Sequence, residues 1–148
     1  MTAPRSVTKD LRHRAREAAL QILYQWEIGR TDVDRAAETL FAHQWPEDED
    51  APEAVKSFAR DLAGDTVRRL ATIDAFIAET SERWRPERMA VLDRLILRMA
   101  VCELLQEPKI PPAVVINEAL ELARTFSTED AVKFINGMLD GIRKKLAG

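Results

Sequence analysis

Residues 110–142 read IPPAVVINEALELARTFSTEDAVKFINGMLDGI, and this stretch decides the fold. Its apolar residues recur every three or four positions, the spacing that places them on one face of an α-helix. Ser127, with Asp130 three residues later, resembles a capping box and predicts the start of a second helix. The stretch therefore predicts two successive amphipathic helices, one over residues 113–126 and one that continues to about Leu146.

The same periodicity runs through the rest of the chain, whereas the alternation typical of strands is absent. We therefore expect an all-α fold, a compact helical protein of about six or seven helices. A chain of 148 residues has the right length for one domain with its own core. Four earlier helices are expected at residues 10–28, after Thr31-Asp32, at residues 52–84 with an irregularity at Gly64, and from Arg85-Pro86 to Glu107-Pro108.

Positive charge is concentrated at the N-terminus. Five basic residues and one acidic residue give residues 1–16 a charge of +4, which leaves −7 for the remainder of a chain whose net charge is −3. This asymmetry is typical of a localised footprint for a polyanion on an acidic body. Charge alone fits equally well a solvated basic arm that keeps the protein soluble.

Signals for a membrane, for secretion and for catalysis are missing. No apolar run reaches about 18 residues, and no apolar stretch follows the basic N-terminus, so we expect a soluble, cytoplasmic protein. There is no glycine-rich phosphate loop, no HExxH and no paired cysteine, and His13 and His43 stand thirty residues apart. We therefore expect no catalytic residue, no metal and no cofactor. The single cysteine, Cys102, is expected in the core.

The first predicted helix combines arginines with a core stripe. On a helical wheel, Arg12, Arg16, Leu20 and Tyr24 form a line that climbs away from the stripe, and Arg14 leaves this line. Basic residues that lead to an aromatic ring suit a strand of nucleic acid, with guanidinium groups on phosphates and the ring on a base. The alternative is a second packing face on a helix held between two others. Because Arg14 leaves the line, either the first turn frays and the arm wraps a ligand, or Arg14 makes a separate contact.

The last predicted helix has an aromatic residue beside its core stripe. Phe134 and Asp130 lie one turn apart at the edge, so Phe134 is a candidate platform for stacking, although a neighbouring helix could cover it. Gly137 weakens the helix, which predicts that something approaches its backbone closely. In the apolar fourth helix, Arg94 and Arg98 are expected either in an internal ion pair, with Glu103 or another helix, or in a contact with a partner protein.

Three stretches of the chain resemble the NusB family of bacterial transcription antitermination factors. They are RHRAREAALQILYQWEI at residues 12–28, AVLDRLILRMAVCELL at residues 90–105, and the closing stretch with its INEAL, ELA, ED, KF and NG groups. The resemblance follows the family's order through nearly the whole chain, although residues 28–85 match only in helical character. The closing stretch is the specific part, because the arginine cluster alone would be a weak signal.

The resemblance implies a non-enzymatic adaptor between RNA and protein. Members of the family bind the boxA element of nascent ribosomal RNA leader transcripts and pair with NusE, a small-subunit ribosomal protein, in the transcription elongation complex. The implied organisation is a single NusB-like RNA-binding domain over residues 1–148, with a basic arm at 1–16 and helical bundles at about 10–84 and 86–146. A homodimer that buries the RNA-binding face is a further possibility, and the sequence leaves the choice between monomer and dimer open.

The resemblance also implies site residues. His13 stands where a further basic residue is common in the family. The carboxylate of Asp130 repels the phosphates of RNA, but it can accept a hydrogen bond from a base amino group. For NusE the implied contacts are Asp93 and Arg94. For RNA they are Arg12, Arg14, Arg16, Tyr24, Asp130, Lys133 and Phe134.

Two other readings stay open at this point. A NusB-like domain also precedes a ribosomal RNA cytosine methyltransferase, but that enzyme needs a long C-terminal cofactor-binding domain, and this chain stops at Gly148. The other reading is a helical dimeric regulator or scaffold without an RNA role. Failure to retain boxA RNA would favour this last reading.

Overall fold

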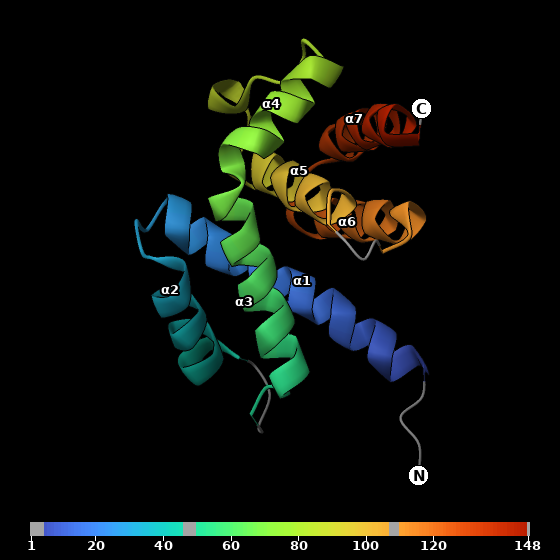
Figure 1. Ribbon diagram of the computed structural model, residues 1–148. Coiled ribbons are helices and arrows are strands. Elements are labelled where there is room, and N and C mark those ends of the chain that lie inside the picture. The colour runs from blue at the N-terminus through green and yellow to red at the C-terminus, as the bar shows by residue number, and fades with distance from the viewer. Residues whose placement is uncertain (1–4, 46–49, 107–109, 148) are drawn as a thin grey trace. The chain divides into compact units, whose positions relative to one another are not determined.

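The computed structural model describes residues 5–45, 50–106 and 110–147. Within these residues the chain forms helices and no strand, which confirms the all-α prediction (Figure 1). Residues 1–4 of the expected basic arm lie outside the described residues. The seven α-helices are α1 (Arg5–Glu27), α2 (Val33–Thr39), α3 (Glu53–Arg68), α4 (Leu70–Thr80), α5 (Val91–Leu104), α6 (Pro112–Phe126) and α7 (Glu129–Ala147).

The chain divides into two compact units between Gly64 and Asp65, a point that lies within α3. The first unit contains α1, α2 and the π-helical segment Leu40–Gln44, and the second contains α4 to α7. The bundle boundary at residues 84–86 that the family resemblance implies thus differs from the division by contacts. It stays a prediction about domain organisation.

In the first unit, α1 packs against α2 and the π-helical segment. The buried side of α1 is wide, because it includes Ala15 and Ile22 of the expected core stripe and extends around the helix to Leu20. Leu11 and Trp26, at the two ends of that stripe, are half-buried. The side chain of Asp32 caps α2 by accepting a hydrogen bond from the backbone N–H of Asp34, as the Thr31-Asp32 pair predicts. The buried residues of α1 are Ala15, Arg16, Ala18, Ala19, Leu20, Ile22 and Leu23.

The turn after α1 explains why this helix ends before Gly29. A Cβ atom at Gly29 would lie 2.8 Å from the backbone oxygen of Gln25, closer than a real side chain tolerates. The next residue, Arg30, has φ 54°, in the left-handed region that few residues other than glycine adopt. The prediction that the helix stops at Gly29 is therefore confirmed.

In the second unit, α5 is the central helix and contacts α4, α6 and α7 (Figure 1). All residues of α5 from Leu95 to Leu104 are buried, which confirms the central position predicted from its apolar sequence. Arg98 forms a two-pronged ion pair with Asp74 of α4, with Nε to Oδ1 and Nη2 to Oδ2 distances of 2.9 Å each. An internal pair with another helix is thus the reading that holds for Arg98. Cys102 is fully buried, and this burial raises the pKa of its thiol.

Several predicted helix boundaries were wrong. The expected helix at residues 52–84 is two helices, and the chain turns at Arg69 rather than at Gly64. The helix expected from Arg85-Pro86 begins only at Val91. Pro86–Arg88 form a 3-10 turn, and the carbonyls of Pro86 and Met89 accept hydrogen bonds from a side chain of α5, described below.

The predicted cap of α7 was also wrong. Thr128, not Ser127, caps this helix, because its hydroxyl accepts a hydrogen bond from the Ala131 N–H at 3.1 Å. Ser127 instead ends α6, where its N–H donates to the Ala123 carbonyl. At Gly137, a Cβ atom would meet no atom of the described residues within 4 Å, so the close approach to this backbone stays a prediction.

Candidate nucleic-acid interface

The three arginines at the start of α1 lie at three different depths. Arg12 is exposed, Arg14 is half-buried, and Arg16 is only 1% exposed. The guanidinium carbon of Arg14 lies 4.4 Å from the ring centroid of Trp45. That of Arg16 lies 5.0 Å from the ring centroid of Phe58. Positive charge that is evenly spaced in the sequence is therefore graded from surface to core.

This gradient answers the question that the helical wheel left open for Arg14. The helix is continuous from Arg5, so its first turn does not fray, and Arg14 makes a separate contact with an aromatic ring. Arg16 offers almost no surface to a phosphate in this conformation. Its RNA contact stays a prediction, and the burial favours a packing role instead.

The other two residues of the predicted line on α1, Leu20 and Tyr24, differ in exposure. Leu20 is buried and belongs to the core, which agrees with the packing alternative for that residue. Tyr24 is 38% exposed and therefore keeps part of its ring accessible for stacking. His13, inside the arginine cluster, has its Nε2 2.9 Å from Oε2 of Glu17, one turn further along the helix.

The first turns of α7 carry the predicted residues of the second unit. Asp130 and Lys133 are exposed, and Phe134 is half-buried, in agreement with its predicted place at the edge of the core stripe. The guanidinium carbon of Arg83, from the turn after α4, lies 4.7 Å from the Phe134 ring centroid. This surface thus combines an aromatic ring, two cations and one carboxylate.

Asp93 and Arg94, the residues predicted for NusE, are half-buried at the start of α5 and have partners within the chain. The Ser127 hydroxyl donates a hydrogen bond of 2.6 Å to Oδ1 of Asp93. Nη1 of Arg94 donates to the carbonyls of Pro86 and Met89, at 3.3 and 3.1 Å. Desolvation and the neighbouring charge of Arg98 lower the pKa of Arg94. Arg94 therefore holds the segment before α5 in place, and Asp93 holds the junction between α6 and α7.

Sequence reasoning missed Arg83 and Trp45. Each lies in a connecting segment far along the chain from its stacking partner, so no periodic pattern links the two positions. In the sequence, Trp45 stands just before the acidic residues 47–50. Its ring centroid also lies 5.7 Å from that of Phe41. Only the packing of the helices brings these cations and rings together.

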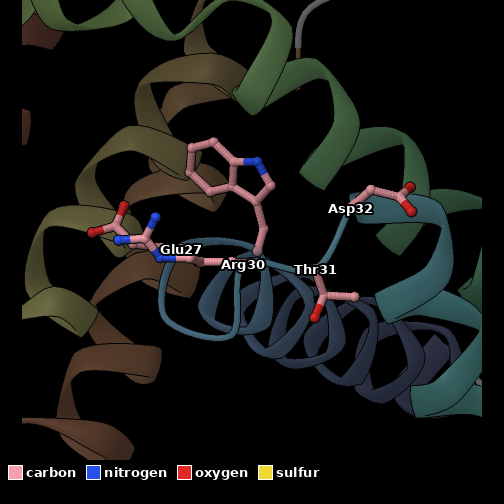
Figure 2. Close-up of a pocket in the computed structure, with 5 residues that line it drawn as sticks. Glu27, Arg30, Thr31 and Asp32 are labelled. Atoms are coloured by element: carbon pink, nitrogen blue, oxygen red, sulfur yellow. The ribbon is translucent and has the colours of Figure 1, made fainter.

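A cavity of about 470 Å³ lies at the turn between α1 and α2. Figure 2 shows Glu27 and Arg30 on one side of it and Thr31 and Asp32 on the other. Because both signs of charge line this open cavity, it has no preference for an anion. None of the residues predicted for RNA lines it.

The described residues form neither a metal-binding cluster nor a membrane-spanning helix. No cluster of three or more His, Cys, Asp or Glu side chains in residues 5–45, 50–106 and 110–147 could hold a metal ion. Within the same part of the chain, no helix has the length and apolar character needed to span a membrane.

Comparisons with known proteins agree on one family. A model of the NusB family matches residues 13–144. The transcription antitermination protein NusB of Koribacter versatilis is 45% identical over 135 residues, which cover 91% of this chain and 90% of that protein. The corresponding protein of Solibacter usitatus is 42% identical over 139 residues, with coverage of 91% and 90%.

Solved structures agree as well. T. maritima NusB superimposes with a TM-score of 0.79 and 34% identity, over 97% of this chain and 93% of that one. A chain from the crystal structure of antitermination factors NusB and NusE in complex with dsRNA has a TM-score of 0.77 and 25% identity, over 92% of this chain and 98% of that one.

Proposed function

The chain belongs to the NusB family, and from this premise we propose that it is a transcription antitermination factor that binds RNA together with NusE. Its RNA target is the boxA element of nascent ribosomal RNA leader transcripts, and it works as part of the transcription elongation complex in the cytoplasm. It acts by binding, as an adaptor, and catalyses no reaction.

One observation carries this proposal. The chain matches, over almost its whole length, a chain from a structure in which NusB and NusE are assembled with RNA. The exposed residues of each unit support an RNA role. On α1 these are Arg12 and Tyr24, and on α7 they are Asp130 and Lys133 beside the half-buried Phe134.

We assign the RNA-binding residues different tasks. Arg12 and Lys133 are exposed cations that neutralise phosphates, and Tyr24 and Phe134 stack on bases. Asp130 accepts a hydrogen bond from a base amino group, a contact that contributes selectivity rather than affinity.

The buried arginines of α1 act indirectly in this proposal. Arg16 supports α1 from within the first unit by packing on Phe58, so it acts on RNA only by positioning the helix. Arg14 binds a phosphate only when it leaves the face of Trp45.

For NusE, we propose that the first turn of α5 is the contact. Asp93 is half-buried and its Oδ1 is hydrogen-bonded to Ser127, so its carboxylate is held in a fixed position before the partner arrives. A charge that is fixed in advance loses less freedom on binding than a mobile one. Arg94 contributes mainly by fixing the preceding turn through its two carbonyl contacts.

The test is a titration of labelled boxA RNA with the protein, alone and in the presence of NusE. A length-matched RNA of shuffled sequence is the control. We expect the protein to prefer boxA over the shuffled RNA, and NusE to tighten the boxA complex. Equal affinity for both RNAs, with and without NusE, would contradict the proposed function and favour a helical regulator without an RNA role.

A further inference from the structure

Arg83 is an exposed cation held against an aromatic ring. It lies in the turn that follows α4, and its guanidinium carbon is 4.7 Å from the ring centroid of Phe134 on α7. Within the described residues, its guanidinium forms no ion pair with a carboxylate. Arg83 therefore keeps its full positive charge available beside the ring.

The backbone on either side of Arg83 is anchored. The N–H of Arg83 donates to the Ser81 hydroxyl at 3.1 Å, and the N–H of Trp84 donates to the Ser81 carbonyl at 3.3 Å. Trp84 is only 8% exposed, and the guanidinium carbon of Arg98 lies 5.7 Å from its ring centroid. The turn and the buried Trp84 thus hold the backbone of Arg83 in a position from which its side chain reaches Phe134.

The guanidinium of Arg83 lies over a face of the Phe134 ring. Phe134 is half-buried, and the guanidinium carbon is 4.7 Å from its ring centroid. A base stacked on Phe134 would occupy the space above the ring where the guanidinium now lies. Arg83 must therefore give way when a base stacks, and the backbone phosphates of that nucleotide are the nearest strong acceptors for it.

We propose that Arg83 is a further RNA-binding residue, whose guanidinium moves from the Phe134 ring to a phosphate of the nucleotide that stacks there. This proposal rests on the proposed function of the chain. A guanidinium suits the task because it stacks on aromatic faces and also offers a planar set of donors that matches phosphate geometry. Glu129 and Asp130 place two carboxylates in the first turn of α7, so a cation from another segment offsets their repulsion of RNA.

The experiment measures boxA RNA affinity as a function of salt for the full-length wild type, Arg83→Ala and Arg83→Lys. Lys145→Ala is the matched control, because Lys145 Nζ lies 4.8 Å above the Phe76 ring in the same unit, about 16 Å further along α7 than Phe134. Thermal melts of all variants report whether the fold is intact. Arg83 is exposed, so Arg83→Ala is expected to melt like the wild type.

We expect Arg83→Ala to bind RNA about tenfold more weakly than the wild type, as one lost charge-assisted contact predicts. The slope of log affinity against log salt should become shallower by about 0.7, and Arg83→Lys should keep the wild-type slope. Lys145→Ala should match the wild type in both. An unchanged slope for Arg83→Ala, or tighter binding by this variant, would overturn the proposal, and tighter binding would mean that Arg83 only blocks the ring.

These outcomes separate the two proposals. If the wild type binds boxA and Phe134→Ala weakens it while Arg83→Ala does not, the RNA function stands and only the role of Arg83 fails. If the wild type does not prefer boxA even with NusE present, both proposals fail together.

Discussion

Cations meet aromatic rings in both units, but at different depths. On α1 of the first unit, Arg16 packs on Phe58 with 1% of its surface exposed, and Arg14 is half-buried on Trp45. In the second unit, Arg83 is exposed and lies over the half-buried ring of Phe134. The same chemical pair therefore stabilises the interior of one unit and remains accessible on the other.

A run of positive charge in the sequence therefore does not by itself identify RNA contacts. Arg12, Arg14 and Arg16 look equivalent in the sequence, yet residues two apart on a helix are rotated by about 200°, so Arg14 cannot share a face with the other two. A cation–ring pair buried in the core fixes a helix, because moving either member would expose apolar area or leave the buried charge without its partner. An exposed pair can exchange its ring for a ligand at little cost.

The largest expected effect is on stability and concerns Arg16. Arg16→Ala removes a large, fully buried side chain from the face of Phe58 and should lower the free energy of unfolding by about 2–5 kcal/mol. Arg16→Met keeps most of the volume and should lose less. Urea denaturation of both variants measures the difference. Arg12→Ala serves as the exposed control and should change stability by less than about 0.5 kcal/mol.

The opposite result would show that the depth of a cation does not decide its role. If Arg16→Ala keeps the wild-type stability but loses RNA affinity, then Arg16 is an RNA ligand, as the family resemblance implies. The gradient of depth along α1 would then have no functional meaning.

The next effect, about tenfold or more, concerns NusE and separates two surfaces of the second unit. Asp93→Arg reverses a charge at the proposed contact and should weaken NusE binding by that factor through repulsion or lost pairing. RNA binding by the isolated protein should change little, because the residues proposed for RNA lie on α1 and α7 and Asp93 lies on α5. Titrations with NusE and with RNA measure the two affinities.

Ser127→Ala is the matched control for Asp93. It removes the hydroxyl that donates to the Asp93 carboxylate at 2.6 Å but keeps the charge, so stability should fall by about 1 kcal/mol while NusE affinity changes little. Equal losses of NusE and RNA binding in a folded Asp93→Arg variant would argue against two separate surfaces.

The smallest effect concerns the exposed arginine of α1. Arg12→Ala should make the salt dependence of RNA binding shallower by about 0.7, the value for one phosphate contact on single-stranded RNA. Arg14→Ala should change it less, because Arg14 must first leave Trp45. RNA titrations at several salt concentrations test both. A larger change for Arg14→Ala than for Arg12→Ala would show that depth in the free protein does not rank these residues.

The sequence predicts the helices of this protein better than it predicts their ends. Periodicity identified the amphipathic helices and the apolar α5, because those patterns are local. The late start of α5 accompanies hydrogen bonds from the guanidinium of Arg94 to the carbonyls of Pro86 and Met89. No pattern within residues 85–91 carries that information.

For the candidate site, too, local positions could be predicted from the sequence and burial could not. Wheel positions correctly placed Phe134 at the edge of α7 and separated Arg14 from the line of Arg12. They could not rank the burial of Arg12 and Arg16, because burial depends on which residues of other segments cover α1. Phe58 and Trp45 decide that ranking for Arg16 and Arg14, and neither is adjacent to α1 in the sequence.

The most direct test of this account is Phe134→Ala, measured by boxA RNA titration and by thermal and urea unfolding. We expect Phe134→Ala to lose about 1–3 kcal/mol in RNA binding, as for one base–aromatic stack, with the free energy of unfolding nearly unchanged. Ile135→Ala is the control, because this fully buried neighbour should cost about 2–5 kcal/mol in stability. A loss of about 3–5 kcal/mol in the stability of Phe134→Ala, or an unchanged RNA affinity, would contradict the placement of an RNA surface on α7.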